Sequence, residues 1–143
     1  MKKYLLCALA IFLLSAQTDK KSLLCHKWMQ FASKSHDDQS PKMIDKSMAK
    51  ECEFRADGSY QETMYNNQLK ISGRWFFNAD QTKFDFTMTE MNGQKLPESP
   101  DAENHINKII VKLTADTLIY GIEGYYGKDR IYGHDDWYFA REK

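Results

Sequence analysis

The chain has 143 residues, and its 20 basic and 20 acidic side chains give a formal net charge of zero. This length is sufficient for one domain with one hydrophobic core. A neutral chain without a basic stripe lacks the electrostatic footprint of a nucleic-acid-binding protein, and it offers anionic membranes no docking patch.

The N-terminus resembles a secretory signal peptide. A basic region of two lysines is followed by an uncharged apolar run, Tyr4 to Leu14, and then by small residues. Because this run is shorter than the roughly 20 apolar residues of a membrane-spanning helix, cleavage near Gln17 is expected instead of retention as an anchor. The pattern predicts a signal peptide over 1–17 and a mature domain over 18–143 with no transmembrane segment. The product would be periplasmic or extracellular.

Two cysteines belong to the predicted mature chain, Cys25 and Cys52. Export would place them in an oxidising compartment, where a disulfide closing a loop of roughly 28 residues stabilises a fold by on the order of 3–4 kcal/mol. Strand alternation opposes this pairing, because Cys25 faces away from Trp28 whereas Cys52 shares a face with Phe54. A disulfide and two unpaired thiols both stay open.

Apolar and polar residues alternate, as they do in strands, in eight segments of the mature chain. This period of two residues differs from that of amphipathic helices, in which apolar residues recur at intervals of three and four. The strands are expected over 24–32, 48–55, 59–65, 69–77, 83–89, 105–113, 117–123 and 131–141.

Polar segments with turn residues separate these strands. A stretch over 33–47 contains a proline and predicts a short helical turn near 41–48, and Asp57-Gly58 predicts a tight hairpin turn. Glycine and proline residues mark a longer loop over 91–104. Because most connections are short, neighbouring strands are expected to be antiparallel. The sequence therefore predicts an all-β fold, an eight-stranded antiparallel up-and-down (meander) β-barrel.

Four short motifs carry a resemblance to a known family. They are Leu24-Cys25-His26-Lys27-Trp28, Phe54-Arg55-Ala56-Asp57-Gly58-Ser59-Tyr60, Gly73-Arg74-Trp75 and Trp137-Tyr138-Phe139. Their order resembles the bacterial lipocalin-like (calycin-type) domains, which begin with Leu-x-Gly-x-Trp and continue with a Phe-x-x-Asp-Gly-x-Tyr hairpin and Gly-x-Trp. The chain departs from this pattern at His26, which replaces the glycine of the first strand. The resemblance implies an eight-stranded barrel with an apolar cavity, although fold likeness alone does not establish function.

The side chains predicted to face the interior are mostly large and aromatic. An eight-stranded barrel is just wide enough to be filled by side chains or to hold one small ligand, so a packed interior and a ligand cavity both stay open. The inward set is Phe54, Tyr60, Met64, Trp75, Phe84, Phe86, Met88, Tyr120, Trp137 and Phe139. Within it, the candidate ligand-binding residues are Trp75, Phe84, Phe86, Tyr120 and Trp137.

Two functions are compatible with this interior. The first hypothesis is non-enzymatic binding of a small hydrophobic or amphipathic ligand inside the barrel. The alternative is an envelope protein-interaction module or inhibitor that acts through the barrel loops around a filled interior.

Titratable clusters give little sign of catalysis or metal binding. The tripeptides His36-Asp37-Asp38 and His134-Asp135-Asp136 repeat, but their spacing suits solvated turns better than a metal site. Glu62 and Asp135 are candidates for an inward carboxylate pair, most simply at a wet barrel mouth. Because no nucleophile accompanies them, we expect no enzymatic activity, no metal and no cofactor.

Overall fold

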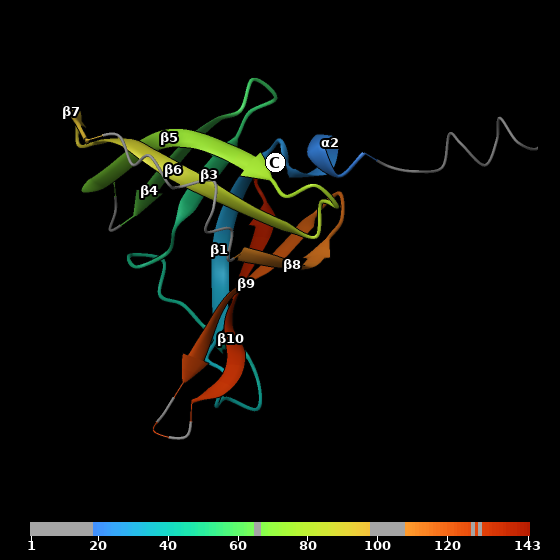
Figure 1. The fold of residues 1–143 in the computed structure, drawn as a ribbon. Coiled ribbons are helices and arrows are strands. Elements are labelled where there is room, and N and C mark those ends of the chain that lie inside the picture. Colours follow the sequence, from blue (N-terminus) through green and yellow to red (C-terminus); the bar gives the residue numbers. More distant parts are fainter. Residues whose placement is uncertain (1–18, 65–66, 98–107, 127, 129) are drawn as a thin grey trace, which may run out of the picture.

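The computed structural model describes residues 19–64, 67–97, 108–126, 128 and 130–143, and Figure 1 shows their arrangement. The predicted signal peptide over 1–17 lies outside the described residues, as do residues 98–104 of the predicted loop over 91–104 and residues 105–107 of the predicted strand over 105–113. The described elements are α2 (Lys20–Leu24), β1 (Lys27–Lys34), β2 (Lys42–Met43), β3 (Glu51–Phe54), β4 (Ser59–Met64), β5 (Leu69–Phe77), β6 (Lys83–Met91), β7 (Gln94–Lys95), β8 (Lys108–Leu113), β9 (Thr117–Tyr126) and β10 (Ile131–Arg141). In these parts of the chain, no helix is both long and apolar enough to cross a membrane.

Eight of the described strands form a closed ring. The order around it is β1-β3-β4-β5-β6-β8-β9-β10, and β10 pairs with β1 to complete the circle. Neighbouring strands are antiparallel throughout the ring. The short strands β2 and β7 pair with β1 and β6, respectively. The prediction of an all-β antiparallel meander is confirmed, because each predicted strand overlaps one member of the ring.

Alternation of side chains assigns an inner and an outer face to each strand. In β5, Ile71 and Trp75 are buried whereas Lys70 and Arg74 are exposed. Trp75 lies opposite Phe86 of β6, and residues directly opposite each other project from the same face of a sheet. The aromatic side chains of successive strands therefore gather on the inside of the ring.

The tightest packing lies where α2 meets the ring. Leu24 of α2 and Trp28 of β1 are fully buried, and they pack in one cluster with Phe54, Leu118 and Phe139. The indole nitrogen of Trp28 donates a hydrogen bond to the carbonyl oxygen of Leu24 at 2.9 Å, which fixes the helix to the first strand. Burial of this many large apolar side chains is the main stabilising contribution to such a fold.

Two predicted segments near the N-terminus are wrong in detail. The first strand begins at Lys27 instead of residue 24, because Asp19 caps a short helix by accepting a hydrogen bond from the backbone nitrogen of Lys21 at 3.0 Å. The helical turn expected near 41–48 is confined to its C-terminal part, where the backbone nitrogens of Met48 and Ala49 donate hydrogen bonds to the carbonyl oxygens of Asp45 and Lys46 at 2.9 and 3.4 Å. The short strand β2 precedes this turn, and its Met43 lies opposite Ala32.

Met88 lies opposite Gly73 and shares the face of β6 with Phe86, as the alternation predicted, but it is 46% exposed and not part of the buried core. Within the described residues, β8 pairs with β6 only at Lys83 and Phe84. Met88 therefore lies on the part of β6 that extends past β8, where the pairing partner on one side is absent from the described ring.

Aspartates stabilise several of the tight turns between strands. Asp45, Asp57 and Asp80 each accept a hydrogen bond from the backbone nitrogen two residues later, at 2.8, 2.8 and 3.1 Å. This Asx-turn geometry favours the turn conformation over continued strand. The hairpin predicted at Asp57-Gly58 is confirmed, and Gly58 there adopts a φ of 83° that favours glycine.

Candidate functional site

The five candidate ligand-binding residues all belong to the interior of the ring, but they divide into two groups. Trp75, Phe84 and Tyr120 are buried in the aromatic core. Phe86 and Trp137 are only partly buried, and they pack against the buried core cluster without belonging to it. Phe86 and Trp137 are therefore the two candidates that keep access to solvent.

Ring contacts connect these residues into a continuous aromatic wall. Phe84 packs edge-on against Tyr120 with centroids 5.2 Å apart, and Tyr120 packs edge-on against Trp137 at the same separation. Phe86 stacks on Tyr60 with centroids 4.3 Å apart. Edge-to-face and stacked pairs of this kind add about 0.5–1.5 kcal/mol each beyond the burial of their surface.

A polar cluster lies within this wall. The buried carboxylate of Glu62, on β4, accepts a hydrogen bond from the hydroxyl of Tyr60. The ammonium of Lys50, which immediately precedes β3, lies 3.7 Å from Glu62 Oε1. The same ammonium lies 3.9 Å from the centroid of a Trp137 ring, in cation–π geometry. We call Lys50, Tyr60, Glu62 and Trp137 the interior polar cluster.

The role of Lys50 was not predicted, although the sequence contains a sign of it. Lys50, Cys52 and Phe54 alternate along one face, and Lys50 is the charged exception on a face that is otherwise apolar. Cys52 lies directly opposite Glu62 across the β3–β4 pair. An inward lysine two residues from the partner of an inward glutamate indicates an interior ion pair.

The ionisable groups around this cluster are held in their neutral forms. Burial raises the pKa of Tyr60 well above its ordinary value, and the nearby Cys52 and Glu62 add to the rise. Burial, with Cys52 and Glu62, likewise raises the pKa of Tyr120. The phenol of Tyr60 is therefore a hydrogen-bond donor at neutral pH.

A second ion pair lies near Phe86. Lys108, the first residue of β8, pairs with Asp85 of β6. Its ammonium lies 4.4 Å from the centroid of the Phe86 ring. Both partners are buried. The pair lies at the short β6–β8 junction, where the described residues of the two strands pair at two positions.

The two thiols are unpaired in the structure. Burial raises the pKa of Cys25, and it raises the pKa of Cys52 well above the ordinary value. A thiol with a raised pKa carries little thiolate at neutral pH and is a poor nucleophile. The cysteines therefore pack as small apolar side chains.

The two His-Asp-Asp tripeptides meet beside the β9–β10 hairpin. The backbone nitrogen of His36 donates a hydrogen bond to Asp135 Oδ1 at 2.9 Å, and its ring stacks on Tyr126 with centroids 3.9 Å apart. Asp135 is thus engaged by the segment that follows β1, whereas Glu62 is buried in the interior, so the two form no carboxylate pair. The described residues hold no group of three or more side chains arranged to bind a metal ion.

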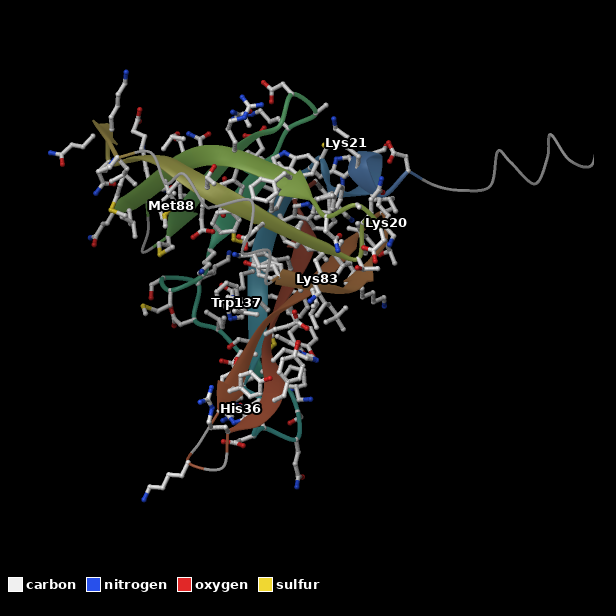
Figure 2. All side chains as sticks on the ribbon, viewed as in Figure 1. Lys20, Lys21, His36, Lys83, Met88 and Trp137 are labelled. Atoms are coloured by element: carbon white, nitrogen blue, oxygen red, sulfur yellow. The ribbon has the colours of Figure 1, made fainter. Side chains whose placement is uncertain are left out.

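Figure 2 places Trp137 near the middle of the molecule, between Lys20 and Lys21 of the α2 end and His36 beside the hairpin. One small pocket of about 110 Å³ is lined by residues that include Met29, Lys46, Glu51 and Met64. It is smaller than the roughly 300–1,000 Å³ of typical ligand sites. The interior polar cluster shares no residue with this pocket.

Comparison with known proteins supports the fold. No family model matches the chain, and no curated protein matches it. The structure is similar to the crystal structure of a DUF4847 family protein from Bacteroides vulgatus ATCC 8482, with a TM-score of 0.50 and 14% sequence identity over 87% of this chain and 97% of that chain. At this identity the likeness shows the fold alone.

Proposed function

We propose that the chain is an exported, lipocalin-like β-barrel protein that binds a small amphipathic molecule without catalysing a reaction. The apolar part of the molecule would lie against Phe86 and Trp137, and its polar part would reach the interior polar cluster. The candidates Trp75, Phe84 and Tyr120 would form the packed floor of this site.

The observation that carries the proposal is the uneven packing of the interior. Near α2 the aromatic core is closed, with Phe84 and Phe139 fully buried. Further along the same two strands, β6 and β10, Phe86 and Trp137 are only partly buried, and Trp137 contacts the lysine of the Lys50–Glu62 ion pair. An interior built only for stability gains nothing from a buried ion pair, because the desolvation of the two charges offsets their attraction.

The direct test is mass spectrometry of molecules extracted from the native protein, purified from the compartment to which it is exported. We expect an amphipathic molecule with the wild-type protein and with Tyr125→Ala, a control at an exposed position. We expect its loss from Trp137→Ala, whose fold is checked by circular dichroism. The proposal is wrong if the wild-type protein carries no such molecule and also fails to bind an apolar fluorescent probe.

One observation favours the alternative, an envelope protein-interaction module. Tyr125 and Tyr132 are 65% and 56% exposed, and their rings contact each other across the β9–β10 hairpin with centroids 5.4 Å apart. The guanidinium of Arg130 lies 5.3 Å from the Tyr125 ring. Exposed tyrosine and arginine side chains are enriched where proteins bind each other. Loss of a captured envelope partner on Tyr125→Ala, with no ligand in the interior, would favour this alternative.

A further inference from the structure

We propose that the interior site selects an anionic headgroup, carboxylate or phosphate, and that the Lys50 ammonium receives it. This inference rests on the proposed function, because it specifies the chemistry of the amphipathic ligand. The headgroup would bind at Lys50, and the apolar body would extend along Trp137 and Phe86.

The sign of the charge that a ligand would meet follows from the exposure of the two partners. The side chain of Lys50 is 22% exposed, whereas that of Glu62 is 4% exposed. The Lys50 side chain is therefore the more accessible of the two partners, and a molecule at the interior polar cluster would meet it before the carboxylate. The accessible charge is positive although the pair as a whole is neutral.

The ammonium of Lys50 also has unused donor capacity. Its contacts in the described part of the chain are Glu62 Oε1 at 3.7 Å and the Trp137 ring at 3.9 Å. Neither distance is short enough for a hydrogen bond. A lysine ammonium carries three donors, and the described residues supply no acceptor within hydrogen-bonding range of it. Anionic oxygens would supply such acceptors in charge-assisted hydrogen bonds, which are the strong class.

The cluster holds the ammonium in position before any ligand arrives. The backbone carbonyl of Lys50 accepts a hydrogen bond from the backbone nitrogen of Gln30 at 2.8 Å, which ties this residue to β1. The ion pair with Glu62 and the face of Trp137 restrict the end of the side chain. Less side-chain entropy is then lost when a headgroup binds.

A cationic headgroup fits the same site poorly. It would have to reach Glu62, whose carboxylate already accepts the hydrogen bond from Tyr60 and is only 4% exposed. It would also have to displace the ammonium from the Trp137 ring. A cationic ligand would thus replace existing contacts, whereas an anionic ligand would add new ones.

The test compares four probes with the same twelve-carbon chain: dodecanoate, dodecyl phosphate, dodecylammonium and dodecanol. Affinities are measured below the micellar range by isothermal titration calorimetry on the mature protein. We expect one or both anions to bind at least about tenfold more tightly than dodecanol, as one charge-assisted hydrogen bond would give. Comparison of the two anions distinguishes a carboxylate from a phosphate ligand.

Three variants test the role of Lys50. Lys50→Met is expected to remove the preference for anions, whereas Lys50→Arg, which keeps the charge, retains most of it. Lys46→Met is the matched control, because Lys46 is an exposed lysine four residues earlier in the same segment. The test does not depend on Lys50→Met alone. If this variant fails to fold, the proposal is still overturned when either the wild-type protein or Lys50→Arg binds dodecanol as tightly as it binds dodecanoate and dodecyl phosphate.

The outcomes separate this inference from the proposed function. Equal binding of anions and dodecanol, or tighter binding of dodecylammonium, overturns the anionic headgroup and leaves amphipathic binding in place. Failure of all four probes to bind overturns the anionic headgroup; the proposed function is overturned with it if the wild-type protein also carries no amphipathic molecule and binds no apolar fluorescent probe. An anion preference that persists in Lys50→Met overturns the assignment to Lys50.

Discussion

Gly73 of β5 lies directly against the backbone of Thr87 in β6. A Cβ atom at position 73 would lie 1.8 Å from the carbonyl oxygen of Thr87 and 2.8 Å from its carbonyl carbon. The register of the β5–β6 pair shifts between Ser72 and Gly73, as at a β-bulge. The glycine of the Gly73-Arg74-Trp75 motif is therefore required for close approach of two backbones.

We expect Gly73→Ala to destabilise the fold strongly. The methyl group has no space unless one backbone moves, and overpacking of this kind costs about 1–3 kcal/mol or more. The free energy of unfolding in urea measures the effect. Gly124→Ala is the control, because a Cβ there would meet its nearest atom, in the Tyr126 ring, at an ordinary 3.5 Å. Equal stability of the two variants would contradict this account of Gly73.

The Lys50–Glu62 pair predicts an asymmetric response to mutation. Lys50→Met leaves a carboxylate that is almost fully buried without its cation, whereas Glu62→Gln leaves a lysine that still has access to water. We therefore expect Lys50→Met to lower the free energy of unfolding by about 1–3 kcal/mol, and Glu62→Gln to lower it by less. The double variant should recover part of this loss in a double-mutant cycle. Strict additivity of the two single effects would show that the residues do not interact.

The cysteines should resist thiol reagents in the folded protein. Burial raises the pKa of both thiols, and more so for Cys52. In the mature protein we expect slow modification by Ellman's reagent at pH 7.5, with Cys25 reacting before Cys52, and rapid modification of both in denaturant. A mass two daltons below that of the dithiol form would instead identify a Cys25–Cys52 disulfide.

The turn aspartates predict a loss of stability in acid. Hydrogen bonds from Ser59 lower the pKa of Asp57 below its ordinary value. Because the folded pKa lies below the unfolded one, the ionised carboxylate stabilises the fold above about pH 4. This stabilisation is lost as the pH falls through the lowered folded pKa.

Thermal unfolding of the wild-type protein and Asp57→Ala between pH 2 and pH 7 measures this contribution. We expect the wild-type protein to have the higher Tm at neutral pH, and the difference to shrink in acid. A difference in Tm that stays constant down to pH 2 would rule out the ionised carboxylate as its source.

The strands were predictable because their signal is local. The predicted strand over 69–77 coincides with β5, and that over 131–141 coincides with β10. In β5 buried residues alternate with exposed ones, and this alternation is visible in the sequence alone. In β10 it holds for Trp137 and Phe139 but not for Asp135, which bonds to the segment after β1. The helix α2 gave no such signal, because its five residues are too few to establish a helical period and only the Asp19 cap marks its start.

The site was only partly predictable because its chemistry depends on contacts distant in the sequence. Alternation placed Phe86 and Trp137 in the interior, but burial separated them from Phe84 and Tyr120. The ion pair of Lys50 with Glu62 depends on the pairing of β3 with β4. The cation–π contact of Lys50 with Trp137 depends on closure of the ring between β1 and β10. Neither pairing is encoded in a single segment.

The most direct test of the account is a titration of the mature protein with dodecanoate, followed through the indole N–H signals of its three tryptophans by ¹H–¹⁵N NMR. Trp28 is the internal control, because it is fully buried and donates its indole hydrogen bond to the backbone carbonyl of Leu24 at 2.9 Å. We expect a saturable shift of the Trp137 signal while that of Trp28 stays in place. A Trp137 signal that does not move, at concentrations where dodecanoate binds, would contradict the account.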